Sequence, residues 1–536
     1  MSVTAEDEKA AAYRQENMGS PKEGSEKDVE TAEPLDLQST YVGDGGASHL
    51  PNEHRQYLLQ RHGTLTLDPL PSNDPADPYN WPDWKKNANL FLVAFHAMMT
   101  TFTAAGIIPA FESIAEDLGC TLQRASYLTS MQIVVLGYAP LFWKPISYRY
   151  GRRPVWLLST LLSAVCNVGC AVSHSYAAMA ACRCLVAFFI SPAIAIGSGV
   201  VVETFFKKDR GRYMGIWALM VTLGPPTGPF IMGFVAYHVG YRWIFWIYTI
   251  INAVQFVGYF FFGPETRYIR QGVEHSGGTF KQEYLTFQRL DPMPLDWYEF
   301  LQPASLAKYT SVMIPAFAYA MVFGFASIFL TVEIPQIFIE KFAFNPQQIG
   351  LQFLGLIIGS VIGEQMGGPL SDFWINRRTK KSSQIRPAPE YRLWLSYFGF
   401  LLVIVGLIVF GVQTENAKHL HWNVTPIVGI AISAVGNQII TTVLVTYAVD
   451  CHPEASSSIG VFVNLIRSTW GFIVPFYAPD MIASLGMSAT GGVMAAIVFA
   501  AGFLPIVLLQ IRGARWRRSR TAKNEARGTD AAGRGD

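Results

Sequence analysis

The chain has 536 residues, of which 51% are hydrophobic and only 15% are charged, and its mean hydropathy is +0.25. Soluble domains usually carry about 25% charged residues. Length alone allows about three or four soluble domains, but the long apolar runs exclude that arrangement.

Residues 1–86 precede the first long apolar run. No apolar stretch follows a basic start, so we expect no cleaved signal peptide. The stretch is rich in Glu, Ser, Gly and Lys, a composition typical of disorder. Its last part differs, because the prolines of residues 65–86 stop regular structure and Trp81 and Trp84 suit a membrane interface. We therefore predict a disordered cytoplasmic tail with a juxtamembrane collar.

Twelve apolar runs follow, and many approach the roughly 20 residues that cross a bilayer as a helix. Backbone in lipid must satisfy its own hydrogen bonds, so these runs are predicted to be helices. The sequence thus predicts an all-α membrane protein of twelve spans in two six-helix halves. The spans are expected at residues 89–111, 125–146, 154–173, 177–202, 213–235, 242–263, 309–332, 346–369, 392–412, 423–448, 456–479 and 488–510.

Basic residues gather in alternate loops. By the positive-inside rule these loops and both termini are cytoplasmic, although the acidic loop at 450–454 goes against the trend. We divide the chain into the tail at 1–86, a first half at 87–263, a cytoplasmic loop at 264–308, a second half at 309–511 and a basic tail at 512–536. The basic sets are Arg149, Arg152 and Arg153; Lys207, Lys208, Arg210 and Arg212; Arg377, Arg378, Lys380 and Lys381; and Arg512, Arg515, Arg517, Arg518 and Arg520.

Two of these loops correspond in the two halves. SYRYGRRPVWLLS at 147–159 follows the second span, and GGPLSDFWINRR at 367–378 ends the eighth, the second span of its half. Corresponding loops indicate an internal repeat of the kind found in secondary transporters. A chance coincidence of two basic loops is the alternative.

These loops resemble the signature of the major facilitator superfamily, Gly-x-x-x-Asp-Arg-x-Gly-Arg-Arg/Lys, and the resemblance covers about residues 88–512. It is closest to the fungal twelve-span drug:proton antiporters. The resemblance implies a latch between the halves at the inner loops. Because Lys144 replaces the glycine and Tyr148 the aspartate, we expect the second loop to dominate it. The latch residues that match are Arg149, Gly151, Arg152 and Arg153 in the first loop and Gly368, Asp372, Arg377 and Arg378 in the second.

A second match, GIWALMVTLGPPTGPFIMG at 215–233, resembles the motif on span 5 of those antiporters. Gly215, Gly224, Gly228, Pro229 and Gly233 are in register, whereas Met232 replaces one expected glycine. Gly224 and Gly228 share a helix face and allow close helix contact, and the prolines should kink the span. The alternative is a bent packing helix with no role in coupling.

Span 8 carries four glycines at intervals of four residues, which drift only about 40° per step round the helix and allow another helix to approach closely. The resemblance implies that spans 5 and 8 face each other across the halves. We therefore expect a glycine seam that slides during rocking, with static packing as the alternative. The seam comprises Gly224, Gly228, Pro229, Gly233, Gly355, Gly359, Gly363 and Gly367.

Polar residues inside the spans are the candidate transport-path residues, because they are costly in lipid and often functional. Arg183 aligns with an arginine of the family's span 4 motif, although Val186–Ala187 replaces its usual Gln-Gly. Glu364 is the predicted carrier of a coupling proton. For the charged members the alternative is a structural ion pair or hydrogen bonds to carbonyls. The set is Glu364, Arg183, Arg467, Asn437, Gln438 and Asn464.

The other sequence motifs give little evidence of function. Four of the six cysteines fall in spans 3 and 4 and are expected to act as small apolar residues, so we predict no metal and no cofactor. Asn423-Val-Thr is a glycosylation sequon, but it lies close to the membrane before Pro426, and we expect it to be unoccupied. No phosphate-binding Gly-rich loop and no nucleophile–base pair on a loop occurs, so we predict no enzyme.

The resemblance implies a monomeric secondary active transporter in the plasma membrane. It would work by alternating access and couple protons to efflux of a small organic compound: a drug, a toxin or a fungal secondary metabolite. The expected partners are the lipid bilayer, that substrate and protons, and no nucleic acid. Two alternatives stay open: proton-coupled import of a polyamine, cation or other nutrient, and a non-transporting nutrient receptor.

Overall fold

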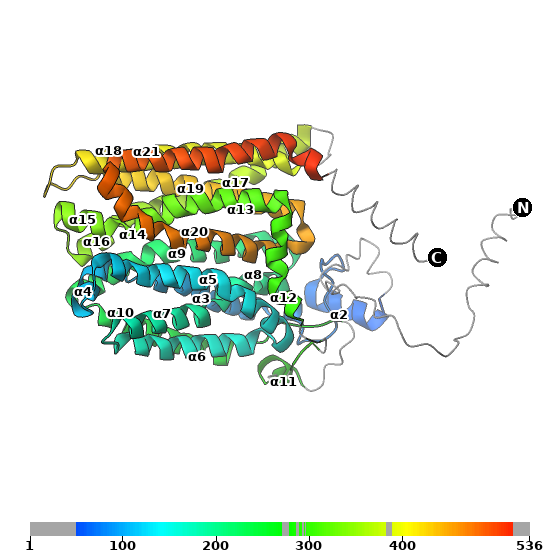
Figure 1. Ribbon diagram of the computed structural model, residues 1–536. Helices are drawn as coiled ribbons and strands as arrows, with labels where there is room; N and C mark the ends of the chain where they lie inside the picture. Colours follow the sequence, from blue (N-terminus) through cyan, green and yellow to red (C-terminus); the bar gives the residue numbers. More distant parts are fainter. Residues whose placement is uncertain are drawn as a thin grey trace, which may run out of the picture. The chain divides into compact units, whose positions relative to one another are not determined.

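A computed structural model describes residues 50–270, 278–285, 289–291, 294, 296–381 and 388–517. Within these residues every regular element is a helix, and twelve helices are long and apolar enough to cross a membrane. Figure 1 shows them side by side in one bundle. The predicted all-α class and the number of spans are confirmed. The tails at 1–49 and 518–536 lie outside the described residues.

The first half contains spans 1 to 6, and two of its spans are interrupted. Span 1 breaks after Gly106, and span 4 breaks at Ser191 before Pro192. The elements are α3 (Asp83–Ala105), η3 (Ile108–Ala110), α4 (Phe111–Asp117), α5 (Leu122–Tyr150), α6 (Arg152–Ala171), α7 (Tyr176–Ile190), α8 (Pro192–Thr204), α9 (Lys207–His238) and α10 (Arg242–Phe262).

The second half contains spans 7 to 12. Span 7 includes a π-helical stretch and then breaks at Glu333. The elements are α13 (Thr310–Phe323), η5 (Gly324–Phe329), α14 (Leu330–Val332), α15 (Ile334–Phe342), α16 (Pro346–Gln352), α17 (Leu354–Lys381), η6 (Pro389–Leu393), α18 (Trp394–Asn416), α19 (Thr425–Cys451), η7 (Pro453–Ala455), α20 (Ser456–Leu485), α21 (Met487–Ile497) and η8 (Val498–Phe503).

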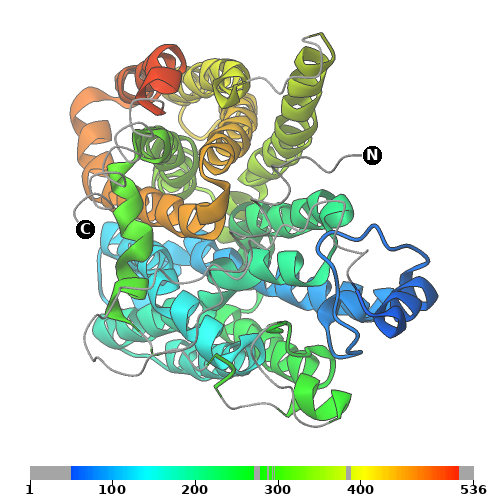
Figure 2. The same ribbon diagram turned by 90° about the vertical axis from the view of Figure 1, so that its right-hand side faces the viewer.

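Short helices lie outside the spans, where the sequence predicted irregular chain. Residues 52–62, which were expected to be disordered, form α2 (Asn52–His62), and the collar adds η2 (Pro78–Asn80). The segment between the halves contains α11 (Thr279–Tyr284), α12 (Trp297–Leu301) and η4 (Gln302–Lys308). These elements lie at one end of the bundle (Figures 1 and 2). We call it the basic end, because Arg149 and Lys207 lie there.

Local signals in the sequence explain where several spans begin. Thr121 caps α5 by accepting a hydrogen bond from the Arg124 N–H (3.2 Å), and Asn345 forms a capping box with Gln348 before α16. Between spans 2 and 3 the chain reverses at Gly151, whose φ of +93° favours glycine. Span 1 was predicted at 89–111, but the helical region runs over Asp83–Asp117, since polar residues also continue the helix beyond the apolar core.

The two halves meet along two pairs of spans. α5 packs along α20, and α9 packs against α16 and α17. At the end away from α2, Gly233 of α9 lies in backbone contact with Gly350 of α16. We call this the closed end. Toward the basic end, by contrast, no atom of another described segment lies within 4 Å of the position where a side chain would begin on Gly215 or Gly368.

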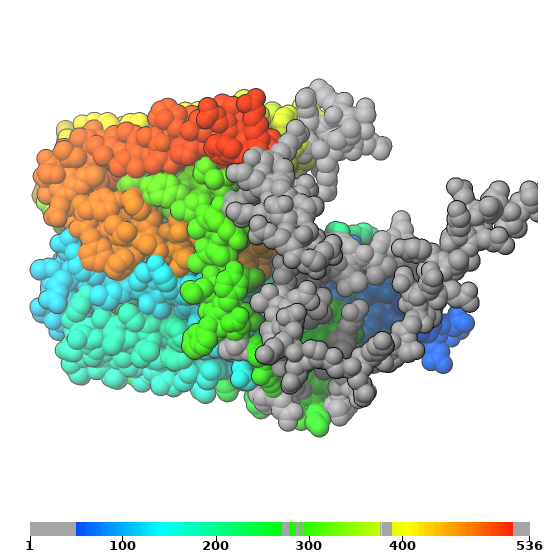
Figure 3. Space-filling view, turned by 45° about the vertical axis from the view of Figure 1, so that its right-hand side comes forward, coloured from blue at the N-terminus to red at the C-terminus, as the bar shows by residue number. Residues whose placement is uncertain are grey.

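The basic end carries the connection between the halves. Residues 296–310 run across it from the first half to the second, shown in green in Figure 3. α12 packs against α5 and η4 against α20, so this segment touches a helix of each half.

Candidate functional site

A polar group links the two halves inside the bundle. Gln438 of α19 is 6% exposed, and its side-chain N–H₂ donates to Glu364 Oε2 of α17 (3.0 Å) and to Thr222 Oγ1 of α9 (3.1 Å). Asn437 donates in turn to Gln438 Oε1 (3.3 Å). Three predicted residues thus form one network, which we call the Glu364 network. Thr222 belongs to the other half and was not predicted.

Glu364 is half-buried, and no ion pair joins it to a basic side chain within the described part of the chain. Its bond with Gln438 is a hydrogen bond between a carboxylate and a neutral amide. Among the described residues the carboxylate therefore lies beside the contact between the halves with no basic partner. A fixed ion pair would favour its charged form, and no such pair is present in that part of the structure.

A second polar group lies at the contact between α5 and α20. Asn464 donates to the backbone carbonyl of Leu136 in the other half (2.9 Å) and accepts from the Arg467 guanidinium (2.9 and 3.0 Å). Arg467 also donates to the Tyr319 hydroxyl (3.2 Å) and lies over the Phe323 ring. The structure brings the predicted Asn464 and Arg467 together, and this group too crosses between the halves.

Arg183 has a different environment. It is 2% exposed and lies wholly within the first half. Its guanidinium donates to the backbone carbonyls of Leu128 (3.3 Å) and Ala104 (3.2 Å) and lies over the Phe245 ring. These contacts tie α7 to α5 and to the end of α3. For Arg183 the sequence left open a transport-path role, a structural ion pair or hydrogen bonds to carbonyls. The observed polar contacts are hydrogen bonds to carbonyls.

At the basic end, Arg149 contacts the segment that connects the halves. It pairs with Asp291 (2.5 Å) and with Glu299, and its carbonyl accepts the Leu290 N–H (2.8 Å). Neither acid was predicted, because no hydropathy pattern marks this loop. The predicted latch residue thus fastens the loop to α5.

The two neighbouring arginines fix the start of α6. Arg152 pairs with Glu203 of α8 (2.7 Å), and Arg153 donates to the carbonyls of Tyr259 (2.7 Å) and Phe260 (2.9 Å) of α10. Their backbone N–H groups donate to the Glu265 carboxylate (2.8 and 2.9 Å). Burial raises the pKa of Glu265, and these N–H groups oppose that rise.

Tyr148 and Lys144, which replace the expected aspartate and glycine, both have partners. The Tyr148 ring lies under the guanidinium groups of Arg152 (4.5 Å) and Arg267 (4.7 Å). Lys144 donates to Ser458 of α20 (2.7 Å) and so joins the halves near the basic end.

The second loop keeps to its own half. Asp372 is largely exposed and pairs with Arg392 (3.2 Å), which also pairs with Asp450 (3.1 Å). Arg377 is exposed, and the side chain of Arg378 lies outside the described residues. The structure thus gives Asp372 a partner on η6, and its dominance as a latch stays a prediction.

The prediction that the glycines of spans 5 and 8 face each other across the halves is wrong. A side chain on Gly355, Gly359, Gly363 or Gly367 would meet α19 of the same half, and one on Gly224 or Gly228 would meet α3. Of the predicted seam residues on span 5, Gly233 and Pro229 face the other half, where Gly233 and the Pro229 carbonyl contact Gly350. The spacing identified surfaces of close packing, but it does not specify the partner helix.

Two further features complete the predicted set. Asn423 is exposed between α18 and α19 and accepts a hydrogen bond from the Thr425 N–H (3.1 Å); its glycosylation state stays a prediction. In the described part of the chain, no three His, Cys, Asp or Glu side chains are grouped as metal ligands would be.

Sequence reasoning also missed Glu333, which is 1% exposed at the break in span 7. The predicted span ended at residue 332, so the glutamate fell in a loop. The apolar residues on both sides, in SIFLTVEIPQIF at 327–338, were the available signal.

In the described part of the chain, twelve helices long enough to span a membrane form two halves that polar side chains bridge, as is typical of a membrane transporter. The profile of the Major Facilitator Superfamily matches residues 90–475, and the chain belongs to that superfamily.

Similar proteins include fungal transporters. The MFS-type transporter atr4 of Stereocaulon alpinum is 28% identical over 96% of this chain and 93% of its own. The efflux pump radE of Floropilus chiversii is 26% identical over 87% and 89%. The structure of the human organic anion transporter MFSD10 is similar, with a TM-score of 0.53 over 78% of this chain and 99% of that one. At 15% identity, that likeness concerns the fold alone.

Proposed function

We propose that this transporter is a proton-coupled efflux protein that works by alternating access and exports a small organic compound. The observation that carries the proposal is the Glu364 network, in which a carboxylate with no counter-ion among the described residues lies beside the contact between the two halves. The names of the relatives atr4 and radE support transport and efflux, respectively. The substrate class follows from the resemblance to drug:proton antiporters.

The network offers a direct route from proton to conformation. An ionised Glu364 accepts a charge-assisted hydrogen bond from Gln438, which is stronger than a bond to a neutral carboxyl group. Gln438 holds Thr222 of the other half at the same time. Protonation of Glu364 weakens the first bond, and this frees Gln438 and loosens the link between α9 and α19.

The geometry of the halves fits one stage of such a cycle. They are in backbone contact at the closed end. If the basic end faces the cytoplasm, as the positive-inside rule predicts, this is the stage closed to the outside. In this orientation both termini are cytoplasmic, and we place the protein as a monomer in the plasma membrane.

The test is Glu364→Gln, which keeps the shape but cannot titrate. Full-length protein in proteoliposomes would be assayed with rhodamine 6G as a lipophilic dye. We expect loss of dye accumulation driven by a pH gradient, with dye binding and gradient-independent exchange preserved. Glu340→Gln, at an exposed glutamate of α15, is the matched control. Normal gradient-driven accumulation by Glu364→Gln would place the coupling proton elsewhere.

A further inference from the structure

Glu333 lies where span 7 breaks near the closed end. The π-helical η5 and the short α14 precede it, and Pro335 follows in the first turn of α15. Proline has no backbone N–H, so the carbonyl of Thr331, four residues earlier, loses its helical donor. The break therefore leaves a backbone acceptor without its helical donor two residues before Glu333.

One oxygen of the Glu333 carboxyl group has a hydrogen-bond donor in the described structure, and the other has none. The side chain is 1% exposed, and Oε2 accepts one hydrogen bond from Gln336 (3.0 Å). Oε1 is fully buried and has no hydrogen-bond partner in the described structure. No basic side chain of the described residues pairs with it or interacts with it electrostatically.

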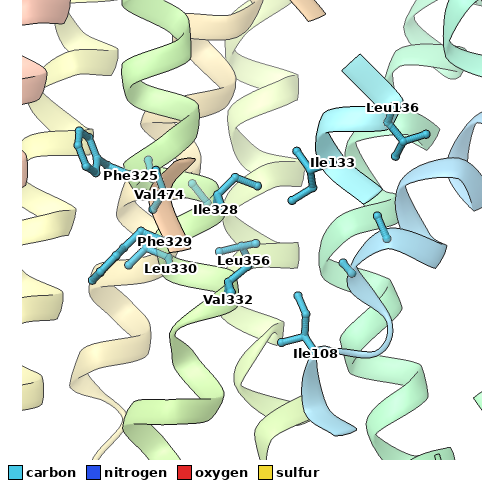
Figure 4. Packing of buried hydrophobic residues seen from close by; sticks show 14 of the residues in the cluster. Ile108, Ile133, Leu136, Phe325, Ile328, Phe329, Leu330, Val332, Leu356 and Val474 are labelled. Carbon is cyan, nitrogen blue, oxygen red and sulfur yellow. The ribbon is translucent and has the colours of Figure 1, made fainter. Parts of the chain in front are cut away.

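The segment just before Glu333 packs among apolar side chains. Figure 4 shows Ile328 and Val332, from the segment just before Glu333, facing Ile133 and Ile108 of the first half. A buried carboxylate without a cation is costly in such a place. A protonated carboxyl group is neutral and carries an O–H, which supplies the donor that the site lacks.

We propose that Glu333 is a second proton-binding group of the transporter, and that it holds its proton while the closed end is shut. The inference deepens the proposed function, because it adds a proton site to a carrier already coupled through Glu364. The two carboxyl groups differ in setting. Glu364 is bonded to Gln438, which in turn donates to Thr222 of the other half, whereas Glu333 is fully buried and accepts from Gln336 of its own span.

The proton is linked to conformation through the contact between the halves. Tyr127 of α5 lies within electrostatic reach of Glu333 and also of Asp480 of α20, and its ring stacks on Phe476 of α20 (4.4 Å). Neither Tyr127 nor Asp480 is basic. Parting of the halves admits water, which stabilises the ionised carboxylate. Proton loss therefore favours opening of this end, and proton binding favours closure.

The test measures opening directly in purified, full-length protein whose six cysteines have been replaced. Ile108→Cys, 1% exposed and facing Val332, is the reporter for a water-soluble thiol reagent. His421→Cys, exposed at the same end, corrects for the effect of pH on the thiol reaction itself. Corrected labelling of Ile108→Cys should rise with pH, by up to about tenfold per pH unit.

Glu333→Gln, a neutral mimic, should keep labelling slow and independent of pH. Glu333→Asp keeps a carboxyl group and should retain a pH dependence, which guards against a result caused by misfolding. Glu340→Gln should behave like the parent protein. A normal pH dependence in Glu333→Gln would overturn the proposal.

A further variant separates this proposal from the one on Glu364. Glu364→Gln should retain the pH-dependent labelling of Ile108→Cys even though it loses gradient-driven transport. If Glu364→Gln transports normally while Glu333→Gln still abolishes the pH dependence, the proposal for Glu364 fails and that for Glu333 stands.

Discussion

At the scale of single residues, Arg183 shows how a buried charge serves packing. Its guanidinium bonds to carbonyls of two other spans, so it holds α7, α5 and α3 together. Arg183→Gln removes most of these donors and leaves the carbonyls unpaired. We expect a loss of about 1–3 kcal/mol in stability, seen as a lower Tm of the purified protein.

The pH dependence of transport should not change in Arg183→Gln, because no titratable partner is bonded to the guanidinium in the described structure. Arg124→Gln, at an exposed arginine that lies over the Tyr176 ring, should leave the Tm nearly unchanged. An altered pH profile with normal Tm in Arg183→Gln would give the arginine a role in coupling instead.

Single residues also show the reach of sequence reasoning. Glu364 and Gln438 stand out because polar groups are rare in apolar runs. Thr222 does not, since a threonine is unremarkable in a helix, and only the approach of α9 to α19 makes it a partner. Glu333 was missed because the predicted span 7 ended one residue before it. No sequence pattern predicts that Asp291 and Glu299 pair with Arg149.

At the scale of elements, the glycine-rich helices pack closely in two ways, within one half and between the halves. The stripe on α17 packs on α19 within one half, whereas Gly233 and Gly350 meet across the halves. Helical periodicity predicts that one face of a helix carries side chains small enough for another helix to approach closely. It does not select a partner, because that depends on how all the spans are arranged.

Gly233→Leu should therefore prevent full closure at the closed end. The added side chain would meet the backbone of α16, which cannot move aside as a flexible side chain does, and such overpacking costs about 1–3 kcal/mol. We expect strongly reduced transport and faster labelling of Ile108→Cys. Gly215→Leu on the same helix, where the space is open, should leave both near normal; equal effects of the two substitutions would contradict the assignment.

At the scale of the whole molecule, the segment between the halves is more than a tether. Arg149 binds it to α5 through Asp291 and Glu299, and η4 packs against α20. The collar joins the same end, since Asp77 pairs with Arg270 (2.8 Å) and Lys85 with Glu283 (2.5 Å). Ion pairs thus hold the collar and the connecting segment to the basic end of the first half.

The orientation of the molecule is the last prediction. Basic residues cluster at the end that carries α2 and α12, and the positive-inside rule places that end in the cytoplasm. Single cysteines at Thr66 and Ala307, both exposed at the basic end, should resist an impermeant thiol reagent added to intact cells. Cysteines at His174 and Lys418, exposed at the closed end, should react, because that end faces outward. All four should react after permeabilisation. Labelling of Thr66→Cys or Ala307→Cys in intact cells would reverse the orientation, and the closed end described above would then face the cytoplasm.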